Sequence, residues 1–152
     1  MKNKIGIVNF GIAGNIHSVK KAIIRSGGDA QVINSPKEIK NTDKLIIPGV
    51  GTFKDAMKAL NDGHFTDELM KYNNPILGIC LGMQILCKLG FENGKTEGLG
   101  KFNAEVKPII CNDKIPHMGF AKLQVVKPNK LLSGVEDQEF YFMHSYEVVN
   151  YT

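Results

Sequence analysis

The chain has 152 residues, 43% of them hydrophobic and 22% charged, with a formal net charge of +4. This length suits a single domain with a real core, and a small, scattered charge gives no reason to expect nucleic acid or a membrane as a partner. No apolar run approaches the roughly 20 residues that span a bilayer, and the N-terminal apolar stretch is too short for a signal peptide, so we expect a cytoplasmic protein.

The first part of the sequence alternates predicted strands with predicted helices. Asn15 is expected to cap the first helix, and Ser35 with Glu38 has the spacing of a capping box. Such alternation predicts an α/β fold, doubly wound around a mostly parallel sheet. The predicted strands are residues 4–10, 30–34, 44–48 and 75–80, and the predicted helices begin near residues 16, 36, 53, 65 and 81, the last running to Leu89.

After Gly100 the pattern changes to strands joined by turns. Strands are predicted over residues 104–110, 121–126 and 139–149, and the last of these alternates two sets of side chains along its whole length. We therefore expect β-rich additions at the C-terminal end, within one domain that covers residues 1–152.

Cys80 lies where the fourth predicted strand turns into a helix, in the segment GICLG. Ligands of doubly wound sheets bind at the carboxyl ends of the strands. The flanking Gly78 and Gly82 give the spacing of a nucleophile elbow, and a following helix favours the thiolate. The alternative is a buried cysteine that acts as a small hydrophobe, which is the interpretation we adopt for Cys87 and Cys111.

A second glycine-rich loop follows the third predicted strand, in PGVG. Gly49 and Gly51 allow the backbone to turn N–H groups toward a ligand, and acyl transfer needs such donors for its oxyanion. The N–H groups of this loop, Val50 included, and of Leu81 are the candidates. The alternative is an ordinary glycine-rich turn between a strand and a helix.

Nothing in the sequence indicates a metal or a cofactor. The three cysteines form no CxxC pair and have no histidines at zinc-ligand spacing, so we expect free thiols. The segment FGIAGN lacks the order G-x-G-x-x-G, so a dinucleotide is not expected.

Five motifs occur in one order along the chain: PGVG, GICLGMQ, TEGLG, PHMGF and HSY. In this respect the chain, from Ile5 to about Val149, resembles the class I, or triad, glutamine amidotransferases, and within them the HisH branch of glutaminase subunits of imidazole glycerol phosphate synthase. The resemblance implies a flavodoxin-like amidotransferase fold and a reaction in which Cys80 attacks the side-chain amide of glutamine. It also implies a HisF-like (β/α)₈ barrel synthase subunit that receives the ammonia.

The resemblance assigns further roles by position. It places Gly49, Val50 and Gly51 in the strand that stabilises the oxyanion. The residues that it assigns to glutamine binding are Gln84, Glu92, Ser145 and Tyr146, and those that it assigns to the partner surface are His117, Met118 and Phe120. Each has a plain alternative: a solvated helix residue for Gln84, a charged loop for Glu92 and a strand aromatic for Tyr146.

The sequence departs from the family pattern at three places. The turn NFGIAGN is one residue longer than the family's usual form, and Phe120–Ala121 follows PHMG where the family has Trp-Asn. The family's catalytic base is a histidine in an H-x-E segment near the C-terminus. None of the four histidines here, at positions 17, 64, 117 and 144, begins such a segment, so the chain looks truncated relative to the family and its activity is expected to be low.

Three other functions remain open from the sequence. The chain could be a HisH-like paralogue that serves amination of surface-polysaccharide sugars, or an inactive module that docks on a barrel. A thiol-based redox protein or hydrolase of related fold is the third.

Overall fold

The computed structural model describes residues 3–151 and contains two compact units. The first unit comprises Met1–Lys107 with Val148–Thr152, and the second comprises Pro108–Glu147. Among the described residues, no helix combines the length and the apolar character needed to cross a membrane.

The first unit is built on a parallel four-stranded sheet. Its strands are β1 (Lys4–Val8), β2 (Asp29–Ile33), β3 (Lys44–Gly49) and β4 (Ile76–Cys80), in the order β2-β1-β3-β4. These strands confirm the four that the sequence predicts, to within about two residues at each end, and they confirm the α/β fold class. β4 forms an edge of this sheet.

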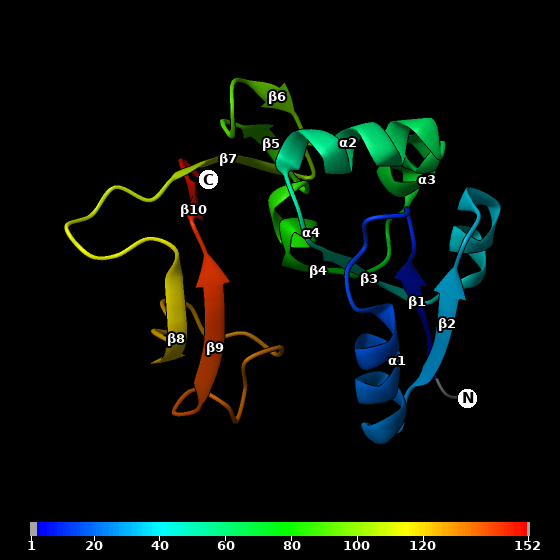
Figure 1. Cartoon of the computed structure of the whole chain (residues 1–152). Coiled ribbons are helices and arrows are strands. Elements are labelled where there is room, and N and C mark those ends of the chain that lie inside the picture. Colours follow the sequence, from blue (N-terminus) through cyan, green and yellow to red (C-terminus); the bar gives the residue numbers. More distant parts are fainter. Residues whose placement is uncertain (1–2, 152) are drawn as a thin grey trace. The chain divides into compact units, whose positions relative to one another are not determined.

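Helices cover both sides of this sheet. α1 (Ile16–Arg25) lies on one side, and α2 (Phe53–Asp62) and α3 (Phe65–Lys71) lie on the other (Figure 1). Both predicted N-terminal signals are confirmed: the Asn15 side chain accepts from the Ser18 N–H at 3.1 Å, and Ser35 and Glu38 form a capping box at the start of the 3₁₀ helix η1 (Pro36–Asn41).

The buried core follows from this layering. Apolar side chains of β1 and β3 lie between the helices, and α2 contributes its inward face. The largest fully buried side chains are Phe53, Ile7, Ile33, Ile39, Leu45, Ile47, Leu60, Leu69, Ile85, Leu86, Val8 and Val106.

The prediction of a long helix after Cys80 is wrong. α4 covers only Leu81–Gln84, and β5 (Cys87–Gly90) follows it. β5 pairs in antiparallel fashion with β6 (Thr96–Glu97) and in parallel with β7 (Phe102–Pro108). The apolar spacing of a short run is compatible with both a helix and a strand. Here pairing with two neighbouring strands stabilises the extended conformation.

The predicted strands of the second half are partly wrong. β8 covers His117–Lys122 rather than residues 121–126, because it pairs with β9 (Glu139–His144) and its last partner, at Lys122, is Glu139. The predicted single strand over residues 139–149 is broken at Ser145. β10 (Tyr146–Val149) belongs to a sheet of order β10-β7-β5-β6, so the chain changes its pairing partner at the break.

Candidate functional site

Cys80 has an unusual backbone conformation for a residue with a side chain. Its φ is 53° and its ψ is −118°, at the junction between the last residue of β4 and the first turn of α4. Such angles cost a non-glycine residue of order 1–3 kcal/mol and concentrate at functional sites. The side chain is exposed. An exposed thiol on a strained turn between a strand and a helix has the geometry of a nucleophile elbow.

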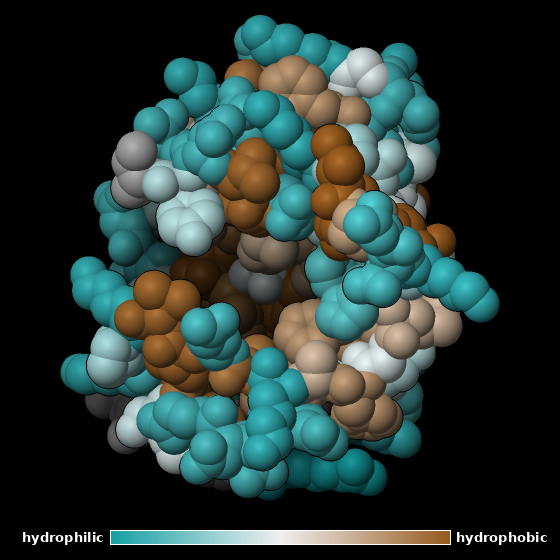
Figure 2. Space-filling model, turned by 90° about the vertical axis from the view of Figure 1, so that its left-hand side faces the viewer, coloured by the Kyte–Doolittle hydropathy of each residue, from teal (hydrophilic) through white to brown (hydrophobic). Residues whose placement is uncertain are grey.

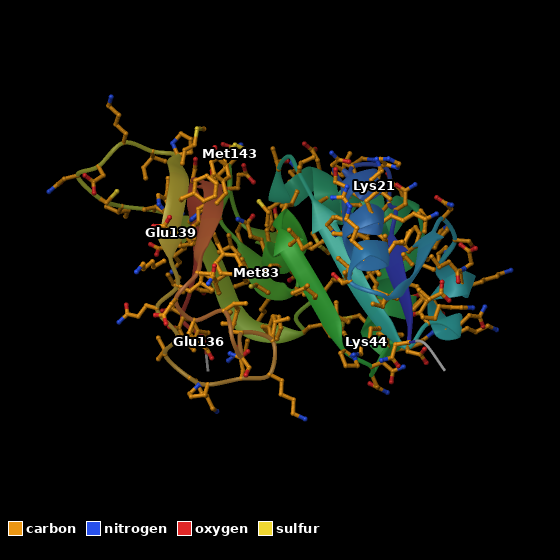
Figure 3. All side chains as sticks on the ribbon, turned by 90° about the horizontal axis from the view of Figure 1, so that it is seen from below. Lys21, Lys44, Met83, Glu136, Glu139 and Met143 are labelled. Atoms are coloured by element: carbon orange, nitrogen blue, oxygen red, sulfur yellow. The ribbon has the colours of Figure 1, made fainter. Side chains whose placement is uncertain are left out.

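The flanking glycines are required by contacts with neighbouring backbone. A Cβ at Gly82 would overlap the Ile47 carbonyl oxygen of β3, and a Cβ at Gly78 would overlap the backbone of Met83. Met83 lies beside the ribbon of β4 in Figure 3. The turn therefore packs backbone against backbone on both sides of Cys80, which fixes the direction of the cysteine side chain.

The PGVG loop lies directly opposite the cysteine. Gly49 is the register partner of Cys80, and a Cβ on Gly49 would lie 2.8 Å from the backbone nitrogen of Gly82. Gly51 has a φ of 100°, which explains its lack of a side chain. The structure thus brings together Cys80, Leu81 and the Gly49–Gly51 loop, as the candidate oxyanion donors require.

One donor of this loop is already in use. The Val50 N–H donates to the Ile12 carbonyl oxygen over a long 3.4 Å, and a Cβ on Gly14 would lie 3.2 Å from the Val50 side chain. The turn between β1 and α1 therefore contacts the loop. This contact of Ile12 is absent from the sequence-based expectations, because a backbone carbonyl leaves no trace in side-chain pattern.

Gln84 is a buried polar residue one turn along α4 from the cysteine. It is 7% exposed. Its side-chain amide makes no hydrogen bond within residues 3–151. Every fully enclosed side-chain nitrogen or oxygen among these residues has a hydrogen-bond partner, so the Gln84 amide is not fully enclosed and retains access to solvent. A polar group in this position is suited to bind a ligand, because burying it without a partner is unfavourable.

Glu92 lies in the turn between β5 and β6 and reaches the first residue of α2. Its Oε2 accepts from the Phe53 N–H, the first of α2, at 2.7 Å. The carboxylate therefore sits at a helix N-terminus, where a negative charge is favourable. No sequence pattern indicates this contact, since it joins residues 39 apart.

The remaining predicted residues lie in the second unit or at its border. His117 and His144 are register partners of β8 and β9, and their rings approach at 3.3 Å between Nδ1 of His117 and Nε2 of His144. The other nitrogen of His144, Nδ1, lies 2.8 Å from the Tyr146 carbonyl oxygen. Ser145 lies at the break between β9 and β10, beside Tyr146.

The β8–β9 hairpin exposes apolar side chains on its strands. Phe120 is 70% exposed and packs edge to face on Tyr141, with ring centroids 5.3 Å apart. Met118 and Met143, register partners, are exposed as well. Figure 2 shows hydrophobic residues exposed at the surface among hydrophilic ones. Glu139 and Met143 of β9 are labelled in Figure 3.

The other two cysteines differ from each other. Cys87 is buried, as predicted, and burial raises the pKa of its thiol. Cys111 is exposed, so its interpretation as a buried hydrophobe is wrong: it lies in the irregular segment between β7 and β8, where its Sγ contacts the Asp113 carbonyl oxygen at 3.7 Å.

Within the described part of the chain, no group of three or more His, Cys, Asp or Glu side chains is placed to hold a metal ion.

Comparison with known proteins identifies relatives over nearly the whole chain. The family model "Glutamine amidotransferase class-I" matches residues 8–152. The chain is 44% identical over 150 residues to the imidazole glycerol phosphate synthase subunit HisH of Desulfitobacterium hafniense, covering 96% of this chain and 71% of that protein. It is 45% identical over 154 residues to the HisH protein of a Geobacillus species, with coverage of 95% and 72%.

Solved structures agree at the level of the fold. One, described as a glutamine amidotransferase, matches with a TM-score of 0.74 at 20% identity, covering 93% of this chain and 71% of the other. Another, from Thermoplasma acidophilum and described as a GMP synthase subunit, matches with a TM-score of 0.72 at 21% identity, covering 100% and 69%.

Proposed function

Because the chain belongs to the class I glutamine amidotransferases, we propose that it is a glutaminase subunit in which Cys80 is the nucleophile. The observation that carries this proposal is the exposed, strained Cys80 at the end of β4, with Gly49 as its register partner. The HisH relatives support imidazole glycerol phosphate synthase, in histidine biosynthesis, as the destination of the ammonia.

The proposed reaction begins with attack of the Cys80 sulfur on the side-chain amide carbon of glutamine. The carbonyl oxygen becomes an oxyanion, which the N–H groups of Leu81 and Gly51 stabilise. Use of the Val50 N–H would require breaking its long bond to Ile12. The amide nitrogen takes up the proton that the Cys80 thiol gives up and leaves as ammonia, and a γ-glutamyl thioester remains. Water then cleaves the thioester, so glutamine and water give glutamate and ammonia.

The proposed contacts to glutamine come from several elements. Gln84 offers a partly accessible amide at the elbow. Ser145 and Tyr146 are proposed to bind the substrate backbone on the strength of the HSY motif. Glu92 is proposed from the resemblance as a further contact, and its carboxylate carries the charge that an ammonium group would need.

His144 is poorly placed to act as the base. A carbonyl oxygen only accepts hydrogen bonds, so the Tyr146 carbonyl requires the proton of His144 to sit on Nδ1. In the neutral ring, Nε2 then accepts from Nδ1 of His117. Both ring nitrogens are engaged, and the chain contains no H-x-E segment. We therefore propose that these 152 residues react at Cys80 but turn glutamine over slowly.

The proposed partner is a HisF-like barrel synthase subunit. His117, Met118 and Phe120 lie on β8, and the exposed apolar side chains around them suit a protein contact better than water. The hairpin would contribute one part of that interface.

The test uses the chloromethyl ketone analogue of glutamine, from which a cysteine sulfur displaces chloride to form a thioether. We expect a single adduct at Cys80, forming at least about tenfold faster than any other, which corresponds to ~1.4 kcal/mol. Peptide mass spectrometry locates the adduct, and Cys80→Ala is the blank. Exposed Cys111 is the internal control, since it should react with iodoacetamide but not preferentially with the analogue. Equal labelling of Cys80 and Cys111 by the analogue would refute the proposal.

A further inference from the structure

The β8–β9 hairpin carries four large apolar side chains on one of its two faces. Side chains alternate between the faces of a strand, and residues that pair directly across two strands share a face. Met118 pairs with Met143, and two residues further along β8, Phe120 pairs with Tyr141. These four residues therefore lie on the same face, which we call the hairpin face.

All four side chains of the hairpin face are open to solvent. Met118 and Met143 are each 58% exposed, and Tyr141 is 55% exposed. The rings of Phe120 and Tyr141 pack edge to face on each other. Exposed apolar surface of this kind favours contact with another protein, and methionine is common at such contacts because its flexible thioether adapts to a partner.

The two methionines of the hairpin face are the most exposed of the methionines that the structure describes. Directly paired residues have Cβ atoms about 5 Å apart, so Met118 and Met143 occupy neighbouring positions on the face. Met70 and Met83 are 45% and 37% exposed, and Met57 is only 6% exposed. Because oxidation follows exposure, an oxidant reaches the thioethers of the hairpin face before that of Met57.

Oxidation by hydrogen peroxide transfers one oxygen atom to each sulfur. The thioether sulfur attacks a peroxide oxygen, the O–O bond breaks, and an S–O bond forms. The sulfur loses two electrons, and the peroxide is reduced to water. The product, methionine sulfoxide, is polar where the thioether was apolar. Two sulfoxide oxygens at neighbouring positions would each need a hydrogen-bond donor, which an apolar partner surface does not supply.

We infer that Met118 and Met143 form a methionine oxidation site, at which a peroxide makes the hairpin face polar and so weakens partner binding. The inference rests on the proposed function for the identity of the partner, a HisF-like barrel subunit. Sulfoxide reductases return the sulfur to a thioether, so the modification is reversible.

The first measurement locates the oxidised residues. The isolated chain is treated with hydrogen peroxide, and the oxygen gained by each methionine is followed by peptide mass spectrometry. Dithiothreitol then reverses the oxidation of cysteine thiols to sulfenic acids or disulfides and leaves the sulfoxides in place. We expect Met118 and Met143 to be oxidised several-fold faster than buried Met57. Equal rates at these three residues would overturn the inference.

The second measurement is the affinity for the barrel subunit before and after peroxide, by isothermal titration calorimetry. Oxidation should weaken binding by the parent chain about tenfold or more, the cost of a polar group left without a partner. The double variant Met118→Leu with Met143→Leu keeps both side chains apolar, and peroxide should not change its affinity. Met70→Leu, at an exposed methionine of α3, is the matched control and should remain as sensitive as the parent. An equal loss of affinity in the double variant would overturn the inference.

A fluorescent dye tests the hairpin face without any partner. Anilinonaphthalene sulfonate fluoresces when it binds exposed apolar surface. Peroxide should lower this signal in the parent chain and in Met70→Leu, but not in the double variant. An unchanged signal in the parent, once both sulfurs are oxidised, would contradict the inference. If the untreated chain does not bind the barrel subunit but the dye pattern holds, the proposed partner is wrong and the oxidation site stands.

Discussion

Cys80 adopts backbone angles that few residues with a side chain adopt, and small neighbours make this possible. From the sequence, Gly78 and Gly82 are expected to relieve crowding around a nucleophile. The structure gives a more specific reason: each glycine touches backbone, Gly82 at Ile47 and Gly78 at Met83. Gly49, opposite the cysteine, is constrained less severely, since a Cβ there would lie 2.8 Å from the Gly82 nitrogen.

Gly82→Ala should therefore destabilise the protein strongly. The new methyl group would overlap the Ile47 carbonyl oxygen, and because that oxygen belongs to β3 neither partner can turn away. We expect the free energy of unfolding to fall by about 3 kcal/mol or more, as measured by urea denaturation.

Gly63→Ala is the control for that substitution. Gly63 is the C-cap of α2 with a φ of −81°, and a Cβ there would lie 3.0 Å from the Phe65 ring, without the overlap that a Cβ at Gly82 would make. The loss there should be about 1 kcal/mol or less. Equal losses in the two variants would mean that the elbow can relax and that its backbone contacts do not demand glycine.

Sequence reasoning found residues whose role shows in local pattern and missed those whose role depends on distant contacts. Cys80 and the PGVG glycines stand at strand ends, so their meeting follows from the parallel order of the strands. The bond between Val50 and Ile12 and that between Phe53 and Glu92 join segments 38 and 39 residues apart, and each uses a backbone group. Neither could be read from side-chain spacing.

At the scale of elements, the first half of the chain was predictable because its boundaries carry local signals. Asn15 and the Ser35–Glu38 capping box mark helix starts, and four apolar runs give the parallel strands. The segment after Gln84 was not predictable, since its apolar spacing fits a helix and the pairing of β5 with β6 and β7 overrides it. The break at Ser145 likewise reflects a change of partner strand.

The β8–β9 hairpin gives a prediction about partner binding. We expect Phe120→Ala to weaken binding to a HisF-like barrel subunit by roughly 2 kcal/mol or more, because exposed aromatic anchors often dominate interfaces. Isothermal titration calorimetry measures the affinity. Phe120 is 70% exposed in this structure, so its truncation should leave the fold intact.

Leu131→Ala is the matched control, since Leu131 is an exposed apolar residue of the same unit outside the hairpin strands, at 68% exposure. The affinity of the Leu131→Ala variant for the barrel subunit should match that of the parent chain. An unchanged affinity in Phe120→Ala would remove Phe120 from the interface.

At the scale of the whole molecule, the chain forms two compact units, and the first contains Cys80, the PGVG loop, Gln84 and Glu92. The chain spans 71% of the Desulfitobacterium HisH protein. Its family membership follows from the matched sequence, and the fold agrees with solved amidotransferase structures.

The lack of an H-x-E segment gives a prediction about turnover. The 152-residue chain, mixed with a barrel partner, should release little glutamate, because ammonia needs a proton to leave and the thioester needs a base to be hydrolysed. A form extended by the H-x-E segment of a HisH relative should release much more. Equal rates in the two forms, with His144→Ala abolishing the rate of the short one, would show that His144 serves as the base.

The most direct test of the central claim is competition at Cys80. The rate at which the chloromethyl ketone analogue alkylates Cys80 is measured by intact-mass spectrometry with L-glutamine, with D-glutamine and with neither. We predict that L-glutamine slows the reaction in a saturable way and that D-glutamine does not, because we propose that the reagent and L-glutamine bind at the same place, beside the elbow and the PGVG loop. Alkylation of Cys80 at the same rate in all three conditions would contradict the assignment of Cys80 to glutamine chemistry.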